Sequence, residues 1–349
     1  MQISRRSLLS WGARGLAGGI AARWLAPVAR AAEGGPRVFS EKARVALASG
    51  GDSRAGNILD ALRRIEPDIR KGLARRKGLL VKPNLVSTLH PLSVTKPECL
   101  DGLLEFFRPL VKGEILIAES TASAPASEAF DQYGYRRLEK QYGARLIDLD
   151  TQPHVIRHVA DHRYRPHAVR FSRLLMDPDL YVVSVTVMKT HDRAVVTLSL
   201  KNLVVGGLLK DETFRWSDRS RGRNDKVLVH GGPANEAIHY NMFSLALLRQ
   251  PDLAVIDGWV GMEHNGPVLG EPVDHKVAVA GTDWLAADRV AVELMGFDFA
   301  KVGYLTFCAQ AGMGQADLER IEILGGRISD LARRYRPHDN IEQQYKWMA

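Results

Sequence analysis

The feature that most constrains the fold is a regular alternation of short apolar runs with segments of helix length over residues 43–150. Capping residues or prolines open the helical segments, as at Ser53 and Pro97. This alternation is typical of parallel strands joined by helical crossovers. We therefore predict an α/β fold, with one or more mostly parallel sheets flanked by helices. The predicted strands are 44–49, 78–82, 114–118 and 145–149, and the predicted helices are 55–65, 97–107 and 126–142.

The second half of the chain continues the α/β pattern around one very apolar run. Residues Asp179 to Val187 form this run, which predicts a central strand covered on both faces. Residues 209–229 are rich in Arg, Asp and Gly, and we expect a long exposed loop there. The chain length allows one large lobe or two lobes around a crevice. Further predicted strands are 252–256, 276–280 and 321–324, and further helices are 237–248 and 284–295.

Residues 1–31 carry the parts of an export signal. Paired arginines, Arg5 and Arg6, precede an apolar run that ends at Leu25, and Ala29-Arg30-Ala31 forms a small-x-small cleavage site. Paired arginines mark the twin-arginine variety, which predicts the Tat translocase as a partner and a periplasmic or extracellular location. We expect cleavage near Ala31. The predicted organisation is a signal over 1–31, a linker over 32–42, an α/β domain over 43–330 and a polar C-terminal tail over 331–349.

Charge and cysteine content exclude several classes of protein. Of the net charge of +8, five units lie in residues 1–31, which leaves +3 for the rest of the chain and disfavours a nucleic-acid partner. No later run is long enough for a stable transmembrane anchor. Cys99 and Cys308 are too few to ligate an iron–sulfur cluster from this chain alone. The sequence leaves open whether they pair, although folding in a reducing compartment before export favours two free thiols.

Polar residues follow several predicted strands at the point where each strand ends. In open α/β sheets, ligands bind beyond the carboxyl ends of the strands. Lysine and histidine donors at this edge predict a site for a carboxylate or phosphate group. A lysine there can also extend its ammonium group into solvent, and the sequence leaves both interpretations open. The strand-end groups are Lys82 with Asn84, Glu119-Ser120-Thr121, Lys189-Thr190-His191, and Asp257.

The types of residue suggest different roles in such a site. His191 suits an acid/base, an anion donor or a metal ligand. Lys201 and Asn202 precede a glycine pair that would let the backbone approach a ligand closely. Asp257 and Glu263 lie in a glycine-rich stretch that suits metal ligation, acid/base chemistry or turn formation. We expect His191, Lys201 and Asp257 to be catalytic, Lys82, Asn84, Lys189 and Asn202 to bind the cofactor, and Glu263 with Asp257 to bind any metal.

A histidine cluster elsewhere in the chain is a weaker candidate. His154, His158 and His162 share one face of a strand or a helix. Only a helix would resemble the HExxH zinc motif, and its glutamate is missing. Because the neighbouring residues alternate between apolar and polar, we prefer a surface strand.

Several motifs in order along the chain resemble those of an uncharacterised family named domain of unknown function 362. The resemblance covers about residues 45–325 and implies no assigned reaction. Some members carry iron–sulfur modules, which implies a redox setting, but in this chain a cluster would have to belong to a separate partner. The motifs are Lys82-Pro-Asn-Leu85, Lys189-Thr-His191, Val196-Thr-Leu-Ser-Leu-Lys-Asn-Leu203, Asp257-Gly258, Asn265-Gly-Pro267 and Ala280-Gly-Thr-Asp283.

A fainter similarity links the chain to the nickel-pincer lactate racemases. It implies that Lys201 would carry the cofactor and that Ala280-Gly281-Thr282-Asp283 matches a late conserved segment of that family. The sequence thus predicts an exported enzyme, a redox enzyme or an isomerase, that binds a small anionic substrate or cofactor. The alternatives are a non-catalytic periplasmic binding or redox-accessory protein and an enzyme like the pincer racemases. The cofactor is not identified by the sequence.

Overall fold

The computed structural model describes residues 42–218, 222–230 and 236–348. The predicted twin-arginine signal and nearly all of the predicted linker lie outside these residues. The described residues belong to one compact unit, Val38–Ala349, rather than to two lobes around a crevice. Within these residues, no helix is both long and apolar enough to span a membrane.

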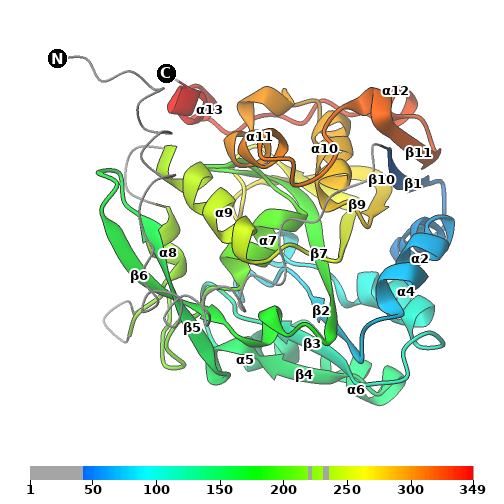
Figure 1. The fold of residues 1–349 in the computed structure, drawn as a ribbon, viewed down its shortest axis with the longest axis horizontal. Coiled ribbons are helices and arrows are strands. Elements are labelled where there is room, and N and C mark those ends of the chain that lie inside the picture. The colour runs from blue at the N-terminus through cyan, green and yellow to red at the C-terminus, as the bar shows by residue number, and fades with distance from the viewer. Residues whose placement is uncertain (1–41, 219–221, 231–235, 349) are drawn as a thin grey trace, which may run out of the picture. The chain divides into compact units, whose positions relative to one another are not determined.

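A nine-stranded sheet forms the centre of this unit (Figure 1). All of its strands run in one direction except β10 and the short β8 (Val195–Thr197), which pairs with β7. The prediction of a mostly parallel sheet is therefore confirmed. The spatial order is β11 (Ile321–Gly325), β1 (Ala43–Ser49), β10 (Glu271–Gly281), β9 (Leu253–Glu263), β7 (Leu180–His191), β2 (Gly78–Lys82), β3 (Ile115–Glu119) and β4 (Arg145–Asp148).

Helices cover both faces of the sheet because side chains of successive strand residues point to opposite faces. In β1, Val45 and Leu47 join one apolar core, whereas Ala46 and Ala48 join the other. The first core is covered by α7 (Ser199–Gly206), α9 (Glu236–Leu248), α10 (Trp284–Leu294) and α11 (Gly303–Gln310). The second is covered by α2 (Arg54–Arg64), α3 (Glu66–Leu73), α4 (Pro97–Phe107), α5 (Ala126–Gln132) and α6 (Arg136–Tyr142).

The two cysteines lie in different cores. Cys99 belongs to the core under α4, and Cys308 to the core under α11 on the other face of the sheet. Both are buried and free, and burial raises the pKa of each thiol above its ordinary value. The structure therefore contains two free thiols, which lie on opposite faces of the sheet.

Two segments differ from the predictions. The helix predicted over 126–142 is divided into α5 and α6, because Gly134 between them has a left-handed φ of 73°. The prediction of an exposed loop over 209–229 is wrong for much of this segment, because Lys210, Phe214 and Lys226 are buried. The segment ends in the short helix α8 (Lys226–Val229). Lys210, Asp225 and Lys226 are buried because they pair with distant segments, a relationship that local composition does not show.

The histidines at 154 and 158 lie on a separate two-stranded hairpin of β5 (His154–Ala160) and β6 (Pro166–Ser172). Both side chains are exposed, and buried or half-buried residues alternate with them along β5. The prediction of a surface strand for this segment is confirmed.

The C-terminal segment, which the sequence sets apart as a polar tail, packs against the rest of the unit. Helix α12 (Ile328–Leu331) leads into it, and it contains α13 (Ile341–Gln344) near its end. Tyr335 and Gln344 are buried. The Gln344 amide accepts a hydrogen bond from Val195 N at 2.7 Å and donates to His191 O at 2.8 Å. This segment therefore helps to fix the turn between β7 and β8.

Candidate functional site

Three neighbouring parallel strands bring their polar ends to one edge of the sheet. Lys82 ends β2, Glu119 ends β3, and Lys189 lies two residues before the end of β7. Because β2 pairs in parallel with both β3 and β7, Lys82 and Glu119 end at the same edge. Strand β7 continues beyond Ser184, the partner of Lys82, and Asn84 in the loop after β2 reaches Lys189. The structure therefore brings together the predicted residues Lys82, Asn84 and Lys189, in agreement with the rule for ligand sites in α/β sheets.

Helix α7, rather than a strand end, carries Lys201 and Asn202 to this edge. Its N-cap residue Leu198 has no side-chain acceptor, and the Asp288 carboxylate of α10 supplies one instead. The N–H groups of Ser199 and Leu200 donate to Asp288 at 2.9 and 3.1 Å. Burial raises the pKa of Asp288 to about 7. A distant carboxylate therefore positions the helix by satisfying its free N–H groups.

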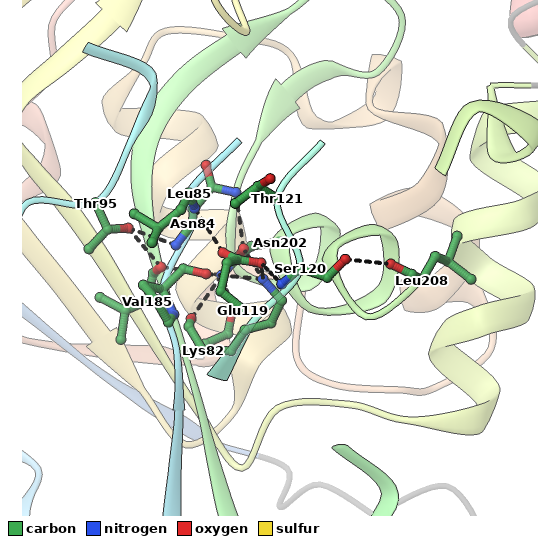
Figure 2. A network of polar contacts seen from close by, with 12 residues as sticks. Lys82, Asn84, Leu85, Thr95, Glu119, Ser120, Thr121, Val185, Asn202 and Leu208 are labelled. Atoms are coloured by element: carbon green, nitrogen blue, oxygen red, sulfur yellow. Dashed lines mark hydrogen bonds and ion pairs between the residues drawn. The ribbon is translucent and has the colours of Figure 1, made fainter. Parts of the chain in front are cut away.

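Lys82 is the centre of a buried network, which Figure 2 shows. Its Nζ donates to Glu119 Oε1 at 2.7 Å, to Asn202 Oδ1 at 3.1 Å and to Pro83 O at 3.0 Å. Asn84 Nδ2 donates to the same Asn202 oxygen at 3.0 Å. Burial lowers the pKa of Lys82, although the charge of Glu119 acts in the opposite direction.

The Lys82–Glu119 pair is closely fitted to its surroundings. Glu119 also accepts hydrogen bonds from Leu85 N at 2.8 Å and from Ser120 N at 2.7 Å, so both of its oxygens are satisfied. A Cβ added at Gly206 would lie 2.5 Å from Lys82 Nζ. This glycine therefore leaves room for the buried lysine.

Lys189 is fully buried, and no carboxylate of the described residues pairs with it. Its Nζ donates to Asn84 Oδ1 at 2.7 Å and to Ser93 O at 2.5 Å. Burial, followed by the charges of Lys201 and Lys82, lowers its pKa well below the ordinary value. Neutral acceptors balance an ammonium charge only in part, so this position remains favourable for an anion.

A second group of charged residues extends the network, and it was missed by the sequence analysis. Lys226 Nζ donates to Ser120 Oγ at 2.6 Å and to Leu208 O, and Ser120 Oγ donates to Asp150 Oδ1 at 2.7 Å. Lys210 forms an ion pair with the same Asp150. Burial lowers the pKa of Lys226 to about 7. Lys210 directly follows an apolar run, as Lys82 and Lys189 do, and this was the available signal for it, whereas Lys226 follows Asn224-Asp225 and has no such signal.

His191 lies at the end of β7 and is held as a neutral proton donor. Its Nδ1 accepts hydrogen bonds from Arg193 N at 3.0 Å and Ala194 N at 3.3 Å, so the ring proton is on Nε2. Nδ1 is also 3.0 Å from Asp192 Oδ1, a contact that is an ion pair only for a charged ring. Burial and the charge of Lys201 lower the pKa of His191 to about 3, so the ring is neutral at pH 7.

His230, also missed by the sequence analysis, stacks on His191 in the opposite tautomer. The ring centroids are 5.8 Å apart with an interplanar angle of 17°. His230 Nδ1 is 2.8 Å from Lys226 O, which can only accept, so Nδ1 carries the proton, and the Nε2 lone pair accepts no hydrogen bond from the described residues. Burial lowers the pKa of His230 to about 4. The two neutral rings therefore offer one donor and one acceptor.

Lys201 lies near these rings and differs from the other lysines of the site. The residue is 7% exposed, and its Nζ has no hydrogen-bond partner within the described part of the chain. Burial lowers its pKa to about 8. Its positive charge helps to lower the pKa values of both His191 and His230.

Asp257 and Glu263 lie apart from this network. Asp257 is in the middle of β9, rather than at a strand end, and its Oδ2 is 3.1 Å from Arg54 Nε of α2 on the other face of the sheet. Burial raises its pKa. Arg54 also lines a pocket of about 240 Å³ with Lys96, Pro91, Leu92, Val94, Val187 and Val260.

The two acids do not form one metal site. Glu263 ends β9 and accepts a hydrogen bond from Arg336 N at 2.9 Å. Six residues of strand place it roughly 20 Å from Asp257, too far for one ion to bind both. Among the residues that the structure describes, no group of three His, Cys, Asp or Glu side chains could hold a metal ion.

Comparison with known proteins places the chain in a family. A curated relative, the thylakoid-associated protein sll1697 of Synechocystis, is 26% identical over 267 residues, which cover 74% of this chain and 76% of the relative. A crystal structure of a Thermotoga maritima protein is 14% identical with a TM-score of 0.37. That match covers 70% of this chain and 60% of the Thermotoga chain, and at this similarity it supports no conclusion. The sequence model of the family described as "Domain of unknown function (DUF362)" matches residues 79–293, and the chain belongs to this family.

Proposed function

We propose that this protein is an enzyme that binds a small anionic molecule at the carboxyl ends of β2, β3 and β7. The observation that carries the proposal is an excess of buried positive charge at this edge. Of five buried lysines, only two donate to a carboxylate within the described residues, Lys82 to Glu119 and Lys210 to Asp150. The five are Lys82, Lys189, Lys201, Lys210 and Lys226.

An unbalanced group of buried lysines is costly in the absence of a ligand. A buried ammonium group needs an opposite charge or several good acceptors, and otherwise it loses its proton. The lowered pKa values of Lys189, Lys201 and Lys226 agree with this cost. A bound carboxylate or phosphate would supply the missing charge and accept charge-assisted hydrogen bonds.

The paired imidazoles favour turnover over binding alone. His191 presents an Nε2 donor and His230 an Nε2 acceptor, so one ring can donate a hydrogen bond to a substrate oxygen while the other takes and returns a proton.

We further propose export of the folded protein by the Tat translocase and a location in the periplasm or outside the cell. The features of residues 1–31 support this proposal. Because this chain cannot ligate a cluster with its two cysteines, any iron–sulfur chemistry would come from a redox partner. The mass of the mature protein tests export, since cleavage near Ala31 is expected.

A thermal-shift panel at constant ionic strength tests the anion site. Phosphate, oxalate and pyruvate should raise the Tm, whereas glycerol and acetamide, which carry no charge, should not. The shift should disappear in Lys189→Met but persist in Lys140→Met, since Lys140 is an exposed residue of α6. Equal shifts for charged and neutral compounds would contradict the proposal.

A further inference from the structure

We infer that Lys201 is a nucleophilic amine that forms an imine with the carbonyl group of a small anionic aldehyde or ketone. The inference rests on the proposed anion site and names its class of substrate. Its basis is the contrast between Lys201 and the four other buried lysines at this edge of the sheet.

Four of the five lysines are held by acceptors, and Lys201 is not. The ammonium groups of Lys82, Lys189, Lys210 and Lys226 each donate to at least one protein oxygen. Lys201 Nζ has no such partner within the described residues, although the side chain is largely buried on α7. An amine without acceptors keeps its lone pair available once it is neutral, and a pKa of about 8 makes the neutral form accessible near pH 7.

The surroundings of Lys201 supply both proton transfers that imine formation needs. The Nε2 lone pair of His230 can accept a proton and pass it on, and the Nε2–H of His191 can donate a hydrogen bond to the oxygen that receives it. Backbone hydrogen bonds fix these opposite tautomers, so neither ring needs to titrate. Lys201 is close enough to both rings for its charge to affect their pKa values.

The chemical step balances with these groups alone. The lone pair of Lys201 Nζ attacks the carbonyl carbon, a C–N bond forms, and the C=O π electrons move to oxygen. The Nε2–H of His191 donates a hydrogen bond to that oxygen, and His230 Nε2 takes a proton from the attacking nitrogen and passes it to the oxygen. His230 then carries the second amine proton to the carbinolamine hydroxyl, which leaves as water while the nitrogen lone pair forms the C=N bond. One water is released, and nothing is oxidised or reduced.

The charge of the site restricts the carbonyl compound to an anion. Lys189 is close enough for its pKa to respond to Lys201, and it lacks a carboxylate partner. An acid group bound at Lys189 would place an adjacent carbonyl near Lys201. A 2-oxo acid and a short phosphorylated aldehyde share this arrangement of acid and carbonyl.

Reductive trapping of the full chain tests the inference. The protein is treated with glyoxylate, glycolaldehyde phosphate or neutral acetaldehyde in the presence of cyanoborohydride, and the adduct is located by peptide mass mapping. We expect one adduct, on Lys201, with at least one of the two anionic probes and at least 10-fold faster than with acetaldehyde. The responding probe distinguishes carboxylate from phosphate recognition. Lys226 should remain unmodified because its Nζ donates to Ser120 and Leu208.

Three variants make the test specific. Lys201→Arg keeps the positive charge and should abolish trapping, whereas Lys140→Met should be trapped at the rate of the wild type. His230→Gln should slow trapping about 10-fold or more without changing the site of the adduct, and the rate should keep the pH dependence set by Lys201.

The outcomes separate the two proposals. A main adduct on any other lysine, equal rates with acetaldehyde, or no adduct in a protein that binds anions would overturn the imine and leave the anion site intact. Failure of the same protein to bind any anion would overturn the proposed function itself.

Discussion

Lys189 Nζ lies 2.7 Å from Asn84 Oδ1, and this hydrogen bond joins the end of β7 to the loop after β2. The same Asn84 amide donates to Asn202 of α7, so one side chain links a strand, a loop and a helix. A change in the charge of Lys189 therefore acts on all three segments. Several predictions about stability and binding depend on this network and its neighbours.

The Lys82–Glu119 pair is expected to be strongly coupled. Lys82→Met or Glu119→Gln alone should lower the free energy of unfolding by about 3–5 kcal/mol, because each leaves the other partner buried and uncompensated. The double variant should lose clearly less free energy of unfolding than the two single variants lose together. Urea unfolding of the four proteins measures this coupling energy.

An exposed pair provides the control for this cycle. Arg145 Nη1 lies 2.7 Å from Glu114 Oε1, and both side chains are largely exposed to solvent. Arg145→Met should therefore change the free energy of unfolding by less than about 1 kcal/mol. If the losses in free energy of unfolding of Lys82→Met and Glu119→Gln add up in the double variant, the buried pair is not coupled.

Gly206→Ala is expected to disturb the site because it fills the space that Lys82 occupies. The added methyl group would lie 2.5 Å from Lys82 Nζ, which should cost about 1–3 kcal/mol of stability and weaken anion binding. Gly56→Ala, at an exposed position of α2, is the matched control, because its added methyl group would lie near Ser53 Oγ alone, at 3.1 Å. Thermal unfolding and anion titration of both variants check the prediction, and unaltered binding by Gly206→Ala would contradict it.

Asp288→Ala is expected to weaken anion binding from a distance. Loss of the carboxylate leaves Ser199 N and Leu200 N without an acceptor and should cost about 1–3 kcal/mol of stability. The displaced α7 should then hold Lys201 and Asn202 less well.

The control for this variant removes a similar cap elsewhere. Asp283 caps α10 through Ala286 N at 3.0 Å, away from the lysines. Asp283→Ala should lower the Tm without reducing anion affinity. If the two variants reduce affinity equally, general loss of stability rather than the position of α7 is responsible.

The lysines should make stability depend on pH above neutrality. The pKa of Lys226 is about 7 in the folded protein and 10.5 when unperturbed, so between these values the unfolded chain binds more protons. Stability therefore rises with pH in this window, by up to about 1.4 kcal/mol per pH unit for one lysine. Urea unfolding between pH 6.5 and 8.5 should show a smaller rise for Lys226→Met than for the wild type. Identical pH slopes would contradict the buried position of this charge.

Part of the site follows from the sequence because parallel strands share an edge. Lys82, Asn84 and Lys189 end apolar runs, and the sheet brings them together as the pattern predicts. Lys201 and Asn202 also reach this edge, although they do so on a helix whose cap comes from Asp288. That contact spans almost ninety residues of sequence and leaves no local pattern.

The rest of the site could not be predicted because it depends on contacts between segments that are distant in the sequence. Lys210 and Lys226 lie in a stretch whose mixed charges predict an exposed loop, and they are buried because Asp150 and Ser120 accept their hydrogen bonds. The sequence predicts Asp257 at a strand end, but β9 continues as far as Glu263, so Asp257 lies within the strand. A charged residue inside a strand is difficult to predict when its partner, Arg54, comes from another element.

The measurement that tests the account most directly is calorimetric titration of oxalate and phosphate at pH 8 in two buffers with different ionisation enthalpies. A bound anion should raise the pKa values of the unbalanced lysines, so binding should take up protons from the buffer. We expect this uptake in the wild type and in Lys140→Met. In Lys189→Met, affinity should fall by at least about tenfold. Binding without proton uptake, or with equal affinity in Lys189→Met, would contradict an anion site formed by the buried lysines.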